Sequence, residues 1–420
     1  MNITIFGGSL ASLTLADCLV QDQINFTWIT LGEKIGGHFS GFQIQQDTQD
    51  IGMVLLEFVP GKNNPSKYSE LEGEQEALGN FFRDIFLEEA SVEVLSNKKL
   101  IPDFIISDNL DVISLRKKNY FSNSNPIKHP RDKWLNSWFE EVNYESVCTE
   151  LYPEFYLDYL KKIANKITSG SANKLSARYH RSAWLPLYYP ESISGDNNPL
   201  SIYPFQKIKG SNLANFIIQK IQTIKQSPYA KIDERLHSNL SADHLSHDIG
   251  TQKFFGCDTL KLPGTKKYFD NSKYFQPKYN ICVLELKHNV DLLPDSIFDL
   301  DDESIFRVTC SSGSYTGKQY LFFEANSVTK SCSEFVKYCS DYTIKNFGLD
   351  VAQSVMCKVD FGGPRLAKAG AEDNLFRLKA FVESNHASQN CHFYGMHNGI
   401  NAMAMNKQIA HALNTWRSQI

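Results

Sequence analysis

The chain has 420 residues, of which 42% are hydrophobic and 21% are charged. This composition is typical of a globular protein and excludes collagen, a coiled coil or a disordered chain as a description of the whole. Lys and Arg number 43 against 47 Asp and Glu, so the formal net charge of −4 gives no electrostatic reason to expect nucleic acid as a partner.

The sequence predicts a cytoplasmic protein without an integral membrane segment. No apolar run approaches the roughly 20 residues that a membrane-spanning helix requires. The apolar stretch at the N-terminus has no Lys or Arg before it and contains Asp17, unlike a signal peptide. The nine cysteines are scattered without a Cys-x-x-Cys pair, so we expect a reducing compartment, buried cysteines and no metal site.

The first 30 residues predict a strand, a helix and a second strand. Residues 2–6 are β-rich, Gly7-Gly8-Ser9 interrupts them, and residues 10–20 carry apolar side chains at helical spacing. Residues 26–30 are again β-rich. A strand, helix and strand within about 30 residues form a βαβ unit, which predicts a parallel sheet.

The turn after the first strand is the first candidate binding site. The dinucleotide-binding fingerprint places glycines at positions 7, 9 and 12, where this chain has Gly7, Ser9 and Ser12. Serine is small and polar, so a pyrophosphate could still approach the backbone at the start of the helix. A similar turn without a ligand is an equally common alternative. The candidate cofactor-binding residues here are Gly7, Gly8, Ser9, Leu10 and Ser12.

Gly36-Gly37-His38 follows the second strand, and with the first turn it resembles a superfamily of FAD enzymes. Its members are the amine oxidases, the protoporphyrinogen oxidases and the UDP-galactopyranose mutases. The resemblance implies that Gly36, Gly37 and His38 lie close to the flavin pyrophosphate. It places the ribose-binding acid of the superfamily on Thr30, whose hydroxyl is a weaker partner than a carboxylate.

Asp50-Ile51-Gly52 resembles the Asp-x-Gly of the strand that returns beside the flavin, which implies that Gly52 allows close approach. The alternative is a glycine in a strand bulge.

The middle of the chain predicts a mixture of helices and strands without an internal repeat. The aromatic side chains of residues 131–168 recur at helical spacing, which more often indicates a core than a ligand site. Helices are expected over residues 78–92, 131–168, 211–226 and 401–416, a hairpin over residues 101–115, and strands over residues 231–236, 282–286 and 307–310.

Three further segments resemble parts of the same superfamily. Residues 235–239 resemble a strand that is followed by an adenine contact, which implies that role for the Leu240 backbone. Residues 305–308 and 321–324 resemble two strands of the substrate domain, for which a plain core sheet is the preferred interpretation.

The C-terminal segment resembles the closing strand and helix of the superfamily, in which the helix N-terminus points at the isoalloxazine ring. The resemblance implies that the helix dipole stabilises the reduced flavin. The spacing is most similar to that of the mutases, which carry an Arg where this chain has Met396. The residues implied to face the flavin are Gly395, Ala404, Met405 and Asn406.

For substrate contacts the sequence offers arginines beside aromatic residues. Arg178, Arg181 and Tyr188 lie in one such stretch and could hold a phosphate or a carboxylate, or could simply be solvated. Arg365 follows a Gly-Gly-Pro turn and is a further candidate. His38 and His397 flank the two expected flavin-binding stretches and could tune the flavin or move a proton, although a histidine at the surface is the commoner outcome.

The fold class implied is α/β, with a Rossmann-like FAD-binding domain and an inserted α+β substrate domain. The FAD-binding domain is expected to comprise residues 1–60, 201–265 and 385–420, and the substrate domain residues 61–200 and 266–384. We expect an FAD-dependent oxidoreductase that transfers a hydride from a small-molecule substrate to flavin. The alternatives are a redox-neutral, mutase-like enzyme acting on a nucleotide sugar and a non-catalytic relative; the oligomeric state stays open.

Overall fold

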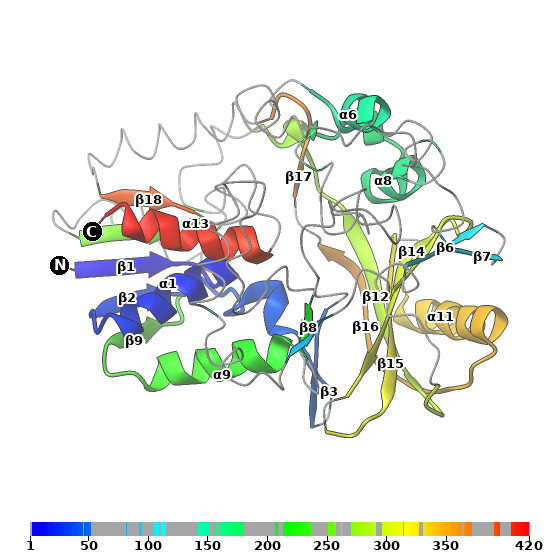
Figure 1. The fold of residues 1–420 in the computed structure, drawn as a ribbon, viewed down its shortest axis with the longest axis horizontal. Coiled ribbons are helices and arrows are strands. Elements are labelled where there is room, and N and C mark those ends of the chain that lie inside the picture. Colours follow the sequence, from blue (N-terminus) through cyan, green and yellow to red (C-terminus); the bar gives the residue numbers. More distant parts are fainter. Residues whose placement is uncertain are drawn as a thin grey trace.

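The structure is a computed structural model, and Figure 1 shows two sheets side by side, with the parallel sheet on the left. The residues that it describes are 2–44, 46–51, 81, 92–94, 104–108, 111–114, 142–151, 157, 160–177, 179, 206–208, 213–236, 251–257, 262, 270–290, 296–313, 315–326, 331–362, 365–371, 390–394 and 405–419.

The first sheet is entirely parallel and has the strand order β18-β10-β1-β2-β9. Its strands come from the beginning, the middle and the end of the chain, so segments far apart in sequence build one layer. The prediction of a parallel α/β sheet is therefore confirmed. The strands are β1 (Asn2–Phe6), β2 (Phe26–Ile29), β9 (Ala230–Asp233), β10 (Thr251–Phe255) and β18 (Cys391–Phe393).

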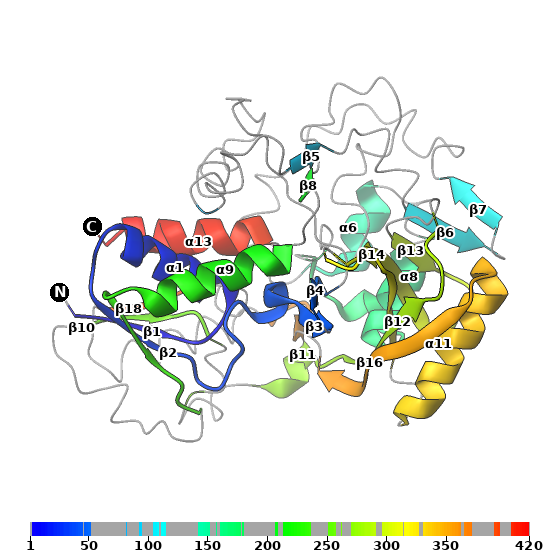
Figure 2. The same cartoon turned by 90° about the horizontal axis from the view of Figure 1, so that it is seen from below.

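Both faces of this sheet are covered, and its central strands place apolar side chains on both faces. Ile3 and Ile5 pack under the helices, whereas Phe6 points to the opposite face. There Phe6, Phe255 and Phe393 form a ladder of stacked rings, with centroids 4.8 and 5.1 Å apart. Figure 2 shows the three helices on one face: α1 (Leu10–Gln21), α9 (Leu213–Gln226) and α13 (Met405–Arg417).

The second sheet has the order β16-β12-β15-β14-β13-β6-β7. All of its pairs are antiparallel except β13 with β6. The predicted hairpin within residues 101–115 is confirmed as β6 and β7. The strands are β6 (Phe104–Asp108), β7 (Asp111–Ser114), β12 (Lys278–Leu286), β13 (Ser296–Asp299), β14 (Ile305–Ser312), β15 (Gln319–Asn326) and β16 (Val351–Gly362).

The two faces of this large sheet have different neighbours. Helix α11 (Cys332–Phe347) covers the outer face and shares its core. The inner face packs against the hairpin of β3 (Phe42–Ile44) and β4 (Asp47–Gln49), where the Phe42 and Phe322 rings lie 6.0 Å apart. Asp47 also accepts a hydrogen bond of 2.8 Å from the Tyr315 amide. The inner face therefore looks towards the part of the chain that follows Gly36 and Gly37.

Smaller elements complete the described structure. Val92 opens a strand, so the helix expected over residues 78–92 does not include Val92, because cross-strand pairing with Ile208 overrides the local pattern there. Within the described part of residues 131–168 the structure has the helices α6 (Tyr144–Leu151) and α8 (Lys161–Thr168). The other small elements are η1 (Gly37–Ser40), β5 (Val92–Val94), η6 (Ala172–Lys174), β8 (Gln206–Ile208), η12 (Asn271–Lys273), β11 (Tyr274–Phe275) and β17 (Leu366–Ala367).

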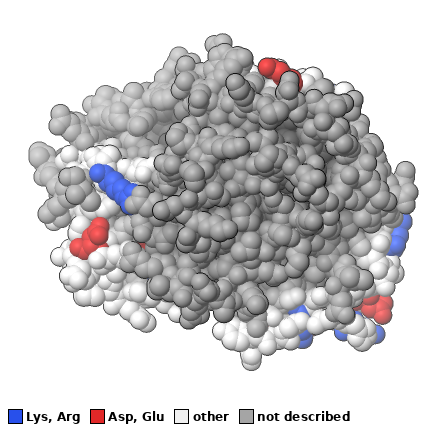
Figure 3. All heavy atoms as spheres, in the orientation of Figure 1, with Lys and Arg blue, Asp and Glu red and all other residues white. Residues whose placement is uncertain are grey.

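Among the described residues, every helix is too short or too polar to cross a bilayer. Figure 3 shows Lys and Arg interspersed with Asp and Glu where described residues reach the surface in that view.

Candidate functional site

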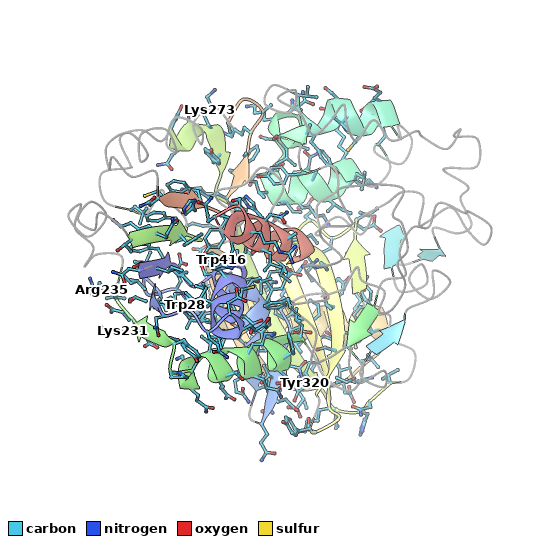
Figure 4. The ribbon with its side chains drawn as sticks, turned by 60° about the vertical axis from the view of Figure 1, so that its left-hand side comes forward. Trp28, Lys231, Arg235, Lys273, Tyr320 and Trp416 are labelled. Carbon is cyan, nitrogen blue, oxygen red and sulfur yellow. The ribbon has the colours of Figure 1, made fainter. Side chains whose placement is uncertain are left out.

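The turn between β1 and α1 is held tightly at Gly7. Gly7 has a φ of +100°, and a Cβ there would lie 2.6 Å from the Cβ of Cys257. The Gly7 amide donates to the carbonyl of Ile29 at 2.8 Å, and the Trp28 indole donates to the carbonyl of Gly7 at 2.7 Å. Both the backbone conformation and the space therefore require glycine at this position. Figure 4 shows Trp28 at this sheet and Trp416 on α13.

Ser9, which replaces the second glycine of the fingerprint, has a role that a glycine could not have. It is the N-cap of α1, and its hydroxyl accepts a hydrogen bond of 3.2 Å from the Ser12 amide. A serine cap satisfies one of the amides that a helix N-terminus leaves without an intrahelical partner. The amide of Leu10, the first residue of α1, belongs to the same end of the helix, where anions bind in related folds.

The third glycine of the fingerprint lets the helix pack closely against the neighbouring strand. Here that space is left by Gly256, which lies opposite Ser12. Gly256 directly follows β10, and a Cβ there would lie 2.2 Å from the Ser12 hydroxyl. The buried Tyr394 hydroxyl lies 3.4 Å from the same oxygen. Ser12 therefore fits because Gly256 has no side chain. The only sequence signal for this exchange is a lone glycine after an aromatic strand.

The backbone amide of Gly8 is hydrogen-bonded to a side chain of the protein. It donates to the Glu33 carboxylate at 2.8 Å. A Cβ on Gly8 would lie 2.9 Å from the carbonyl oxygens of Glu33 and Lys34. Glu33 therefore ties the first turn to the segment that leads into Gly36 and Gly37, a role that the sequence analysis did not assign to it.

The glycine pair lies opposite the first turn. Gly36 and Gly37 have φ values of +81° and +56°. A Cβ on Gly36 would lie 2.7 Å from Ile217 of α9, so this residue faces the protein. Among the described residues, a Cβ on Gly37 would have one neighbour within 4 Å, the Cα of Ser9 at 4.0 Å. The two predicted loops thus face each other closely, and a Cβ on Gly37 would be in van der Waals contact with the start of α1.

Thr30 lies at the carboxyl end of β2 beside the end of β9. Its side chain is buried, and its amide donates to the carbonyl of Asp233 at 3.0 Å. Asp233 forms an ion pair of 2.5 Å with Arg235, which Figure 4 shows at this end of the sheet. The carboxylate that the sequence lacks at Thr30 is therefore present on the adjacent strand, and only the pairing of β2 with β9 reveals it.

Asp50 has a structural task. Its carboxylate accepts hydrogen bonds from the amides of Leu213 and Ala214, at 3.2 and 2.7 Å, and so caps α9. Gly52, the residue implied to approach the flavin, lies outside the described residues.

The inner face of the large sheet carries a buried ion pair that the sequence analysis interpreted as plain core. Arg307 on β14 pairs with Glu324 on β15, and their side chains are 9% and 13% exposed. The register shifts between Ile305 and Arg307, so Phe306 is an extra residue in β14. The Phe306 ring lies 5.6 Å from the ring of Tyr279. Such a bulge re-aims side chains and is common beside active sites.

His38 connects this face with the glycine pair. The residue is solvent-exposed, and the protein atoms packed around its ring lower its pKa by desolvation. The Glu324 carboxylate opposes this shift, whereas the cations of Arg307 and Lys34 add to it. Desolvation also raises the pKa of the Tyr279 hydroxyl, and Glu324 adds to that effect. At pH 7 His38 is therefore a neutral imidazole that can hold or accept a proton.

For the remaining candidate residues the structure gives only their position in the fold. Arg365 is half-buried directly before β17. Met405 and Asn406 open α13. No group of three or more potential metal-ligating side chains occurs within the described part of the chain. Seven candidates and His397 lie outside the described residues: Gly52, Arg178, Arg181, Tyr188, Leu240, Gly395 and Ala404.

Comparisons with known proteins agree at the level of fold. No family model and no curated protein sequence matches the chain. Reduced UDP-galactopyranose mutase is 13% identical with a TM-score of 0.58, covering 100% of this chain and 96% of the other. Cyclohexylamine oxidase from Brevibacterium oxydans is 10% identical with a TM-score of 0.59, covering 99% and 98%. Putrescine oxidase bound to putrescine is 9% identical with a TM-score of 0.61, covering 100% and 99%. The chain therefore has the fold of the amine-oxidase-like flavoproteins.

Proposed function

We propose that this chain is an FAD-dependent oxidoreductase that takes a hydride from a small-molecule substrate. The observation that carries the proposal is the opposition of Gly37 and Ser9 beside the N-terminus of α1. Open parallel sheets bind ligands beyond the carboxyl ends of their strands, and a helix N-terminus there favours phosphate. The fold shared with two amine oxidases and a mutase supports the same placement.

The residues at this end of the sheet fit the two halves of a dinucleotide. The pyrophosphate would lie between Gly37 and the first amides of α1, where Ser9 and Leu10 begin the helix. The adenosine ribose would lie near Thr30, with the carboxylate of Asp233 as the nearby acid. When bound, FAD supplies the hydride acceptor that side chains lack.

The substrate would be held against the inner face of the large sheet. The desolvation that a buried ion pair costs is often not returned by its attraction, so a role in binding is one reason for a chain to keep such a pair. Arg307 and Glu324 would orient a polar group of the substrate, while Phe306 and Tyr279 provide aromatic surface beside it. His38, neutral at pH 7, would accept a proton from the substrate or hold one.

The remaining expectations belong to the same proposal. Residues 1–60, 201–265 and 385–420 would form the FAD-binding domain, with residues 61–200 and 266–384 as the inserted substrate domain. Ala404, Met405 and Asn406 would face the flavin, and Arg178, Arg181, Tyr188 and Arg365 stay substrate candidates. The cytoplasmic location also stays a prediction.

The absorbance spectrum of the purified protein, before and after incubation with FAD and desalting, tests the proposal. Retained flavin bands are expected. Gly37→Ala should lower FAD retention at least tenfold, because the methyl group would lie in van der Waals contact with Ser9, where the pyrophosphate is proposed to approach. Gly317→Ala is the matched control, since its φ of +65° is also positive and a Cβ there has no described residue within 4 Å. Equal retention in the two variants would contradict the proposal.

Two alternatives are distinguished by the same preparation. A protein that retains no flavin would support the non-catalytic relative. A flavin-loaded protein that turns over a nucleotide sugar only after anaerobic reduction would support the mutase-like enzyme, because that chemistry starts from reduced flavin.

A further inference from the structure

Four of the nine cysteines gather where α11 packs on the large sheet. Cys332 and Cys339 are about two turns apart on α11 and so share one side of the helix. Cys282 on β12 and Cys357 on β16 are direct partners across the antiparallel pair, so their side chains project from the same face. Figure 1 shows α11 beside these strands.

The four cysteines form a series of neighbours. The Cys357 sulfur lies 3.6 Å from the carbonyl oxygen of Cys332, and Cys357 is the cross-strand partner of Cys282. Cys282 and Cys339 belong to the same buried core cluster. Neighbouring thiols need little movement to meet the geometry of a disulfide.

Accessibility changes along this series. Cys332 is exposed, Cys357 is half-buried, and Cys282 and Cys339 are buried. An oxidant in solution therefore reaches Cys332 first, and the Cys357 sulfur lies beside the Cys332 backbone. The inner pair belongs to the apolar core of the sheet and α11.

We propose that Cys332 and Cys357 are a site of reversible thiol oxidation that forms a disulfide with a hydroperoxide as oxidant. The Cys332 sulfur attacks the peroxide, the O–O bond breaks, and a sulfenic acid and one water form. The Cys357 sulfur then attacks the sulfenic sulfur, and its proton leaves with the hydroxyl group as a second water. Two thiols are oxidised and one hydrogen peroxide is reduced to two waters.

The environment of Cys357 agrees with its role as the second thiol. Desolvation raises the pKa of Cys357, so this thiol reacts with peroxide more slowly than an exposed thiol such as Cys332. It reacts once an electrophilic sulfur has formed beside it on Cys332.

The bond would join the start of α11 to β16, the edge strand of the large sheet. It would close the chain from 332 to 357, which contains α11 and the turn into β16. Cross-linking such a loop restricts the unfolded chain, so the oxidised protein should melt at a higher temperature. The inference does not depend on the bound flavin.

The test uses the full chain, reduced, desalted and treated with hydrogen peroxide. Peptide mass spectrometry without reductant should find Cys332 linked to Cys357, with two thiols lost per chain. Cys332→Ser and Cys357→Ser each remove one sulfur of the bond, so neither variant should form it or lose two thiols per chain under the same treatment. Cys18→Ser is the control, because Cys18 lies on α1 away from the series, and it should oxidise like the wild type.

A thermal melt gives a second readout. Oxidation should raise the midpoint by a few degrees in the wild type and in Cys18→Ser, reversibly with dithiothreitol, and should leave Cys332→Ser unshifted. Over-oxidation of Cys332 without a link, a link between two chains, or a first link between Cys282 and Cys339 would each overturn the inference.

Discussion

At the carboxyl ends of the parallel strands the candidate ligand contacts are backbone groups, whereas on the large sheet they are side chains in the middle of strands. The first region depends on where Gly7, Ser9 and Gly37 allow the main chain to approach. The second depends on which side chains a bulge at Phe306 turns inward. A site made of backbone groups tolerates a changed motif as long as the ligand can still approach the main chain. A site made of side chains requires both the right residues and the strand register that brings them together.

The largest effect is expected where a buried charge loses its partner in the large sheet. Arg307→Met should lower the free energy of unfolding by about 3–5 kcal/mol, because Glu324 is left buried without its cation. Arg307→Met combined with Glu324→Leu should recover most of this loss. The matched control in the parallel sheet is Arg235→Met, whose half-exposed pair with Asp233 should be worth about 1 kcal/mol or less. Urea denaturation followed by circular dichroism measures all four proteins, and equal losses in the two single variants would remove the contrast.

The next effect concerns the backbone of the parallel sheet. Gly7→Ala should cost about 3 kcal/mol, since it combines a φ of +100° with a Cβ 2.6 Å from Cys257, and it should also weaken FAD retention. Gly317→Ala has the positive φ without the contact and should cost about 1 kcal/mol. The same denaturation measurement applies, and a Gly7→Ala protein as stable as Gly317→Ala would show that the turn can relax.

The exchange between Ser12 and Gly256 is testable as a pair. Gly256→Ala should cost about 1–2 kcal/mol, because its Cβ would meet the Ser12 hydroxyl, and Ser12→Gly should restore much of that stability. A double-mutant cycle measures the coupling. Additive effects would mean that Ser12 does not occupy the space that Gly256 leaves.

The smallest effect is the pH dependence that comes from His38. Its pKa is lowered by desolvation, so between that pKa and about 6.5 the unfolded chain binds more protons than the folded one. The contribution of His38 to the free energy of unfolding should therefore be fully present above about pH 6.5 and should decrease as the pH falls below that value. Unfolding free energies from pH 5 to 7.5 should show a flatter profile for His38→Gln. An unchanged slope would place the titration elsewhere and separate His38 from the inner face of the large sheet.

Local patterns predicted the βαβ unit and the hairpin of β6 and β7 because each depends on neighbours in the sequence. The same reasoning failed at Val92, where pairing with a distant strand decides the conformation. It also interpreted Arg307 and Glu324 as plain core, because a charged residue in a β-rich run shows neither its partner nor the face to which a bulge turns it.

The sequence by itself determined the parallel sheet, the first turn with its required Gly7, and the resemblance that leads to FAD. Those features depend on residues close together in the chain, where hydrophobic period and backbone freedom are directly readable. Only the tertiary structure decided that Gly256 compensates for Ser12, that Asp233 lies beside Thr30, and that Glu33 takes the Gly8 amide. The physical reason is that these contacts join segments whose spacing in the sequence carries no information about their distance, so packing and strand register alone bring them together.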